Sequence, residues 1–249
     1  MSTITESHTI GGLRVRVYKS SKRPTGSIAA VFLLHGRLGF AEDVDSFARI
    51  CLKTAEGQKQ ELYVITLDHR NHGSRLMEER ANKTWEEGNG QHAVDMYAIQ
   101  MGTARDLSFL VDFLPMYLFP HAECKVDAWG VIGISLGGHS TWIALSQGPR
   151  ISVGIPIIGC PDYLALMKHR AQTSGIAFTG PHIPASLLDL IGILDPASKS
   201  YSSLGTSNPF LGKKILILSG EEDTLVPWTA SKTFVESLEV GLAVTKRWL

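Results

Sequence analysis

The residues best suited to chemistry lie in the segment Gly133-Ile134-Ser135-Leu136-Gly137, which has the spacing GxSxG. An apolar run over 126–134 precedes this segment and a helical pattern over 136–146 follows it, so we predict a sharp turn from strand to helix at Ser135. Such a turn lifts a serine hydroxyl above the sheet, and it needs flanking glycines because a Cβ there would strike neighbouring backbone. The pattern predicts that Ser135 is a nucleophile and that the Leu136 amide stabilises an oxyanion. The alternative is an ordinary glycine-rich turn that contains an incidental serine.

Three more polar motifs follow apolar runs. His35 to Gly39 (HGRLG) comes after the run 28–34, and Asp68 to Arg75 (DHRNHGSR) comes after the run 62–67. The third, Gly220 to Pro227 (GEEDTLVP), comes after the run 214–218. Because the carboxyl ends of parallel strands meet at one edge of a sheet, we expect all these motifs to lie at the same edge.

Taken in order, the four motifs resemble those of the α/β-hydrolase superfamily, and the resemblance covers nearly the whole chain. In that family the loop matching Asp68 to Arg75 begins D-x-R-G-x-G. Here Asn71 stands where the family usually has glycine, a modest departure because asparagine accepts a positive φ better than most residues. The resemblance implies that His69 and His72 are polar corner residues and not reactants.

The resemblance also implies roles for residues in the other two motifs. The segment G-x-x-D-x-x-V-P of the family matches Gly220 to Pro227 and makes Asp223 the acid that orients a histidine. An alternative acid is Asp162, which follows another strand. The loop after the run 28–34 supplies the second oxyanion donor, for which we expect the amide of Arg37, with Leu38 as a second candidate. We expect His35 to fix this loop by hydrogen bonding and not to act as a base.

The catalytic histidine of the family has no match in this sequence. The family order is serine, acid, histidine, but the last of the nine histidines is His182, well before Asp223. Three explanations compete: the sequence is a truncated or misassembled form that lacks its C-terminal catalytic segment, the protein is a pseudoenzyme that retains a pocket, or another histidine serves as the base. His92, with Asp95 three residues on, is the best alternative base, whereas His139 lies on the helix after Ser135 and is expected to point away from it.

These motifs require an α/β fold with a mostly parallel central sheet and helices on both faces. Near-continuous apolar runs indicate strands covered on both faces, whereas the alternating pattern over 13–18 indicates an edge or antiparallel strand. Helical patterns over 43–55, 103–114, 136–146 and 228–238 alternate with the runs, and Pro115 is expected to end the second. We predict a single domain, 1–249, in which residues 160–210 form a small helical cap and residues 86–101 border the same opening.

Composition narrows the class of partner. The 24 Lys and Arg residues balance the 24 Asp and Glu residues, so we expect no nucleic-acid partner. The longest apolar run has seven residues, far below the roughly 20 that span a bilayer, and the N-terminus lacks the pattern of a secretory signal. Three widely spaced cysteines suit reduced thiols, and together these features predict a cytoplasmic protein. The sequence does not determine the oligomeric state.

The function expected from this combination is a serine hydrolase that attacks a carboxylic ester, thioester or similar acyl substrate and forms an acyl-enzyme on Ser135. The resemblance implies no metal and no organic cofactor. The alternative is a catalytically impaired binding protein of the same fold that holds a small apolar ligand under the cap, because no histidine follows Asp223.

Overall fold

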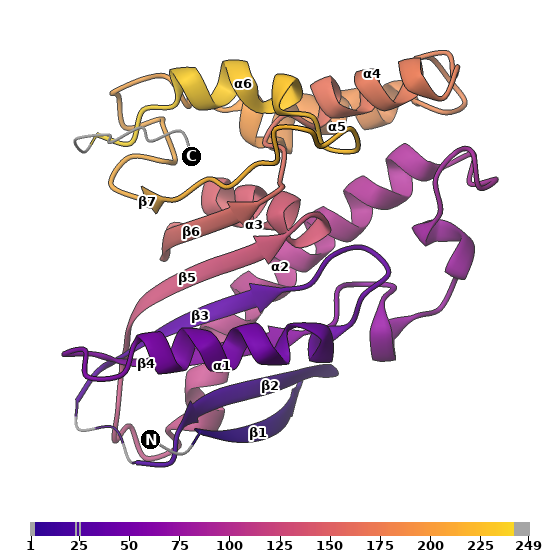
Figure 1. The fold of residues 1–249 in the computed structure, drawn as a ribbon. Helices are drawn as coiled ribbons and strands as arrows, with labels where there is room; N and C mark the ends of the chain where they lie inside the picture. The colour runs from indigo at the N-terminus through magenta and orange to yellow at the C-terminus, as the bar shows by residue number, and fades with distance from the viewer. Residues whose placement is uncertain (1–2, 23, 25, 242–249) are drawn as a thin grey trace.

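A seven-stranded sheet forms the centre of the molecule, with helices on both of its faces (Figure 1). The computed structural model describes residues 3–22, 24 and 26–241. The strand order is β1-β2-β4-β3-β5-β6-β7; β1 and β2 are antiparallel to their neighbours and the remaining pairs are parallel. The predicted α/β class with a mostly parallel sheet is confirmed. The strands are β1 (Thr3–Ile10), β2 (Leu13–Ser20), β3 (Ile28–Leu34), β4 (Glu61–Leu67), β5 (Val126–Ile134), β6 (Ile151–Ile157) and β7 (Lys214–Ile215).

The apolar runs form the parallel strands because both of their faces are covered. β3, β4 and β5 occupy the middle of the sheet, and Phe32, Leu33 and Ile65 are fully buried. The strand with the alternating pattern, β2, is antiparallel as predicted, but it is not at the edge, since β1 pairs along its outer side. The run 214–218 forms only the two-residue β7 and a bridge from Leu218 to Ile157.

The helices divide between the two faces of the sheet. α1 (Asp45–Thr54) packs in front of β3 and β4 through Ala48 and the partly buried Phe47, whereas α2 and α3 lie behind the sheet (Figure 1). Leu107, Leu110 and Trp142 of the rear helices belong to the larger hydrophobic core. The remaining helices are α2 (His92–Leu118), α3 (Leu136–Gln147), α4 (Tyr163–Thr173), α5 (Ala185–Leu194) and α6 (Trp228–Ser237).

α2 differs from the predicted helix at both of its ends. It begins at His92, inside the segment expected to be an insert, and continues through Pro115 to Leu118. Proline lacks the amide that would bond one turn back, but its carbonyl still accepts from the amide of Phe119 at 2.9 Å. The missing bond lies in the last turn, so it shortens the hydrogen-bond ladder without ending the helix.

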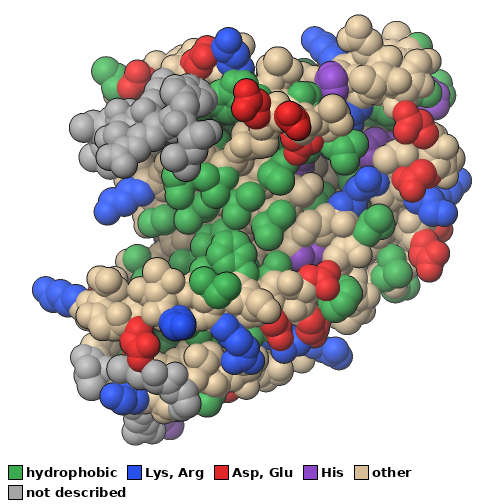
Figure 2. Space-filling model, in the orientation of Figure 1, with side chains coloured by type: hydrophobic (Ala, Val, Ile, Leu, Met, Phe, Trp, Pro, Cys, Tyr) green, Lys and Arg blue, Asp and Glu red, His purple; other side chains and the backbone are tan. Residues whose placement is uncertain are grey.

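The front face of the sheet is less covered beside α1. Ile134, Ile155 and Ile157 are only partly buried there, and Leu216 is 54% exposed. Figure 2 shows hydrophobic side chains gathered in a hollow on this face, above α1. The rear face, by contrast, is packed by α2 and α3 along the same strands.

The segment 160–210 contains α4 and α5, joined by turns. α4 lies near α6 at the top of the view in Figure 1, and its Tyr163 hydroxyl donates to the carbonyl of Ala93 at the start of α2 at 2.6 Å. The position of α4 therefore depends on the same rear helix that packs behind the sheet. Among the described residues, no helix combines the length and the apolar character needed to cross a membrane.

Candidate active site

Ser135 occupies the turn between β5 and α3. Its backbone has φ 52° and ψ −109°, a conformation that residues other than glycine rarely adopt and that costs about 1–3 kcal/mol. The Ser135 amide donates to the carbonyl of Ile157 at 2.8 Å, and its carbonyl accepts from the amide of His139 at 3.0 Å. The side chain is half-exposed, and its hydroxyl has no hydrogen-bond partner among the residues that the structure describes. The backbone is therefore fixed on both sides while the hydroxyl is left available.

The glycines of the elbow (residues 133–138) allow three strands to approach the start of α3. A Cβ on Gly133 would lie 2.1 Å from the carbonyl oxygen of Gly137. A Cβ on Gly137 would lie 2.7 Å from Cβ of Leu34, and one on Gly138 would lie 2.7 Å from the carbonyl oxygen of Ile157. These separations are shorter than any normal contact, so only glycine fits at each position.

The loop after β3 passes directly beside the elbow. A Cβ on Gly36 would lie 3.9 Å from Cβ of Ser135, which places the next residue, Arg37, at the same opening. Leu38 has φ 65°, and the amide of Gly39 closes a turn onto the carbonyl of Gly36 at 3.2 Å. Within the described chain, neither the Arg37 amide nor the Leu136 amide donates to another protein group. Both amides are thus unoccupied, as oxyanion donors must be.

The two candidate acids have different surroundings. Asp223 is half-buried in the loop after β7, where one carboxylate oxygen accepts from the amides of Leu225 and Val226, both at 2.9 Å. Its charge acts on the His139 ring, so it lies near the elbow helix. Asp162 caps the start of α4 by accepting from the amide of Ala165 at 2.8 Å. The carboxylate of Asp162 is therefore already used to cap the helix α4.

His92 and His139, the two histidines considered as partners of Ser135, are both buried. His92 Nδ1 donates to the carbonyl of Lys83 at 2.8 Å, and its Nε2 lies 3.4 Å from Nη1 of Arg170. Burial, with the charge of Arg170 second, lowers the pKa of His92 to about 4. His139 Nδ1 accepts from the amide of Cys160 at 2.9 Å, and burial followed by Arg170 lowers its pKa to about 4 as well. Neither imidazole forms a hydrogen bond with the Ser135 hydroxyl.

The histidines of the HGRLG and DHRNHGSR motifs support the backbone, as expected. His35 Nδ1 donates to the carbonyl of Gly36 at 2.7 Å, and its Nε2 accepts from the amide of His69 at 3.1 Å. The prediction that His35 fixes its loop is confirmed. Asn71 has φ 59°, which confirms the conformation inferred from its place in the motif.

Sequence reasoning did not identify Arg170 as part of this region. This guanidinium projects from α4 and donates to the carbonyl of Leu225, through Nε at 3.3 Å and Nη2 at 3.2 Å, as well as contacting His92. The side chain thus joins α4, the loop that carries Asp223 and the start of α2. The sequence offered no signal for it, since Arg170 follows Lys168 and His169 in a helical segment with several polar residues.

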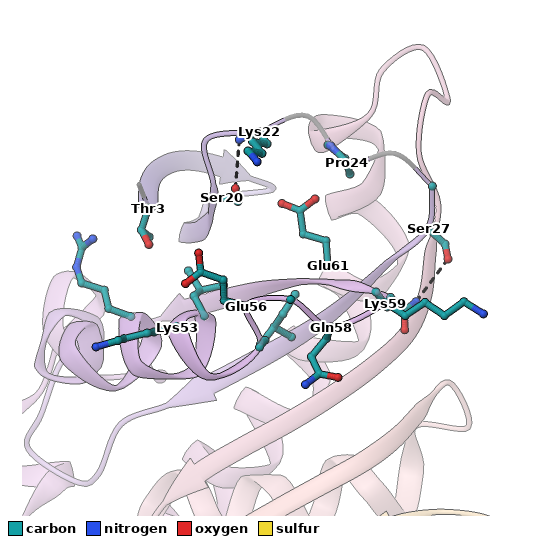
Figure 3. A pocket seen from close by; sticks show the side chains of 17 residues that line it. Thr3, Ser20, Lys22, Pro24, Ser27, Lys53, Glu56, Gln58, Lys59 and Glu61 are labelled. Atoms are coloured by element: carbon teal, nitrogen blue, oxygen red, sulfur yellow. Dashed lines mark hydrogen bonds between the residues drawn. The ribbon is translucent and has the colours of Figure 1, made fainter. Parts of the chain in front are cut away.

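A cavity of about 570 Å³ lies elsewhere, at the amino ends of β3 and β4 (Figure 3). Figure 3 shows charged and polar side chains around it, among them Lys53, Glu56 and Glu61. Since β3 pairs with β5 over its whole length, this cavity is separated from Ser135 by about seven residues of strand, or roughly 20 Å. It is therefore remote from the elbow and contributes nothing to its chemistry.

The fold is similar to that of several solved structures, although the sequences have diverged. TT1662 from Thermus thermophilus has a TM-score of 0.64 and 18% identity, over 96% of this chain and 83% of that one. A putative dienelactone hydrolase from Klebsiella pneumoniae has a TM-score of 0.57 and 12% identity, over 96% and 81%. An acylaminoacyl peptidase from Pyrococcus horikoshii also has a TM-score of 0.57, with 13% identity, and the likeness covers 95% of this chain but only 35% of that one.

The sequence matches no protein-family model and no curated protein. At these identities the structural likeness establishes the fold, which is the fold of α/β-hydrolases, and leaves the chemistry to be argued from the site.

Proposed function

We propose that this chain, which has the α/β-hydrolase fold, is a serine hydrolase that acts on a carboxylic ester, thioester or similar acyl substrate. The observation that carries the proposal is the elbow itself. A serine is held at a positive φ, its hydroxyl is free, and the unoccupied amides of Leu136 and Arg37 lie at the same opening. Backbone strain of this size at a half-exposed polar residue is typical of functional sites.

In the proposed reaction, Ser135 Oγ gives its proton to the base as it forms a bond to the acyl carbon, and the carbonyl oxygen gains negative charge. The base returns this proton to the leaving alcohol or thiol. The amides of Leu136 and Arg37 stabilise that charge, and collapse of the tetrahedral intermediate expels the alcohol or thiol. Water then attacks the acyl-enzyme and releases the acid. Asp223 is the acid that orients the base, with Asp162 as the alternative.

The base is the element for which the described residues offer the fewest candidates. His92 is the alternative base that we carry forward, because its Nε2 faces Arg170 and so lies in the same region as Asp223. A pKa of about 4 makes it a weak base at neutral pH, so an enzyme that depended on it would be slow. If His92 is the base, His92→Gln reduces acyl transfer about 100-fold or more.

A fluorophosphonate probe tests the nucleophile. We expect the full chain to form one adduct, located by mass spectrometry on Ser135, and Ser135→Ala to lose it. Ser140→Ala is the matched control, since this serine lies on the same helix but donates to the carbonyl of Leu136 at 3.2 Å. Absence of any adduct, or an adduct that persists in Ser135→Ala, would refute the proposal.

The second candidate function is a non-catalytic binding protein of the same fold. It is favoured by the hydroxyl of Ser135 lacking a histidine partner among the described residues. In that case a small apolar ligand raises the melting temperature equally in the unmodified chain and in Ser135→Ala. Ester turnover by the two proteins then stays at the background rate.

A further inference from the structure

The guanidinium of Arg170 is the most unusual charged group near the elbow. Burial lowers the pKa of this side chain, and the nearby guanidinium of Arg37 lowers it further. The side chain is half-buried, and no carboxylate among the described residues lies within ion-pair distance of it. Holding a half-buried cation without a counter-ion is unfavourable, so its retention points to a task.

The hydrogen bonds of Arg170 leave part of its fork unused. The group has five N–H donors, of which Nε and one N–H of Nη2 share the carbonyl of Leu225, and one N–H of Nη1 faces His92. One N–H on each terminal nitrogen therefore has no acceptor in the described structure. Two parallel N–H groups on the terminal nitrogens match the two oxygens of a carboxylate.

The surrounding charges leave this region positive. Arg37 acts on both Arg170 and His92, and its own side chain donates to the carbonyl of Asn82 at 2.8 Å. The carboxylate of Glu87 is 3.9 Å from Arg37, but it is an exposed group at the limit of an ion pair and is well screened by water. Asp223 is the acidic group that acts on Arg170, so two guanidinium groups lie near one half-buried carboxylate.

The position of Arg170 relates this charge to Ser135. Its acceptor Leu225 lies two residues after Asp223, and its charge reaches His139, one helical turn after Ser135. Arg37 follows Gly36, the residue that approaches Ser135. The two cations thus flank the opening above the elbow from the cap segment and from the β3 loop.

We propose that Arg170, assisted by Arg37, binds a carboxylate on the substrate, so that the preferred acyl substrates are small monoanionic esters or thioesters. The inference rests on the proposed function, because it names the substrate class of the same site. Arg170 is a specificity-determining residue in this proposal and takes no part in bond making or breaking.

Binding to Ser135→Ala tests the proposal without any need for turnover. The first ligand pair is monomethyl succinate and dimethyl succinate, which differ in one negative charge. The second pair is butyryloxyacetate and its methyl ester, which places the carboxylate on the alcohol side. We expect the anionic member of at least one pair to bind tenfold or more tightly than the neutral member, by calorimetry, and the pair that responds tells which side of the ester carries the charge.

Two substitutions on α4 provide the comparison. Arg170→Met is expected to reduce the preference for the anion to less than twofold, whereas Lys168→Met, an exposed cation on the same helix, leaves it unchanged. If Arg170→Met fails to fold, ionic strength provides an independent test on Ser135→Ala with Arg170 retained. We expect 500 mM salt to weaken binding of the anionic ligand several-fold and to leave binding of the neutral ligand unaffected.

Equal affinity for the anionic and neutral members of both pairs would overturn the inference, as would a preference that survives Arg170→Met. Failure of the fluorophosphonate experiment would instead affect the proposed chemistry, because ligand binding to Ser135→Ala does not depend on a reactive serine.

Discussion

The loops after β4 and β5 lie at the same edge of the sheet, separated by β3, and use their polar residues in opposite ways. In the polar corner (residues 68–75), Asp68 accepts from the amides of Ala41 and Ser74, both at 2.8 Å, and from the Ser74 hydroxyl at 2.7 Å. In the elbow, the backbone of Ser135 is hydrogen-bonded, but its hydroxyl has no partner among the residues that the structure describes. Polarity at a strand end therefore does not identify a reactive group. What distinguishes the elbow is a half-exposed hydroxyl without a described partner on a backbone that is hydrogen-bonded on both sides.

The corner is also joined to α2 by a buried carboxylate. The carboxylate of Asp106 accepts from Nη2 of Arg70 at 2.8 Å and from Nη1 of Arg75 at 2.9 Å. Nη1 of Arg75 also donates to the carbonyl of Asp68 at 3.0 Å. These bonds join the corner to α2 and make it a support for the neighbouring HGRLG loop.

The largest effect is expected from a methyl group added inside the elbow. Gly137→Ala places a Cβ 2.7 Å from Cβ of Leu34 and 2.8 Å from the carbonyl oxygen of His35, so backbone must move. We expect the free energy of unfolding in urea to fall by about 3 kcal/mol or more. Gly192→Ala, in α5 with open space around it, is the control and should raise stability by about 0.5–1 kcal/mol. Equal effects of the two substitutions would contradict the role given to the elbow glycines.

A substitution in the polar corner is expected to reduce the free energy of unfolding by a smaller amount and to leave the reactivity of Ser135 unchanged. Asp68→Ala leaves the buried amide of Ala41 and the amide of Ser74 without their acceptor, which should cost about 2–4 kcal/mol of unfolding free energy. The fraction of folded protein labelled by the fluorophosphonate should not change. Asp189→Ala, an exposed carboxylate on α5, should alter neither quantity. A corner variant that stays folded but is no longer labelled would show that the two loops are not separate in function.

The smallest effect is the dependence of stability on pH. Burial lowers the pKa of His35, His69 and His72, so the folded state holds these rings neutral, while the unfolded chain protonates them near pH 6.5. Their contribution is therefore complete above about pH 6.5 and is lost as the pH falls below that value. Nε2 of His72 is buried without a partner, so protonation there is especially unfavourable.

Urea unfolding at pH 7.5 and pH 5.5 checks this expectation. His72→Gln should reduce the difference in unfolding free energy between the two pH values, and His121→Gln, at an exposed position, should leave it as in the unmodified chain. A slope that is unaffected by His72→Gln would mean that this ring titrates normally in the folded protein.

The order of elements and the positions of the motifs could be predicted from the sequence. Continuous apolar runs must be covered on both faces, and the glycines around Ser135 fix a strand-to-helix turn, because these constraints act over a few neighbouring residues. Where the local pattern was weaker, the sequence did not reveal the strand β1 and placed the end of α2 too early. β1, with its polar TITESHTI sequence, became an edge strand through pairing with β2. The helix expected to end at Pro115 continues to Leu118, because proline removes only one hydrogen bond of the last turn and Leu118 packs against the core.

What the sequence by itself determined is the α/β fold, the turn that presents Ser135 and the loops at one edge of the sheet. Only the tertiary structure decided which polar groups are satisfied: the His35 ring supports a loop, His92 is bonded through both nitrogens, and Arg170 retains donors without a carboxylate. The physical reason is that satisfaction of a side chain depends on acceptors far away in the chain, such as the carbonyl of Leu225 for Arg170, and no local pattern encodes those partners.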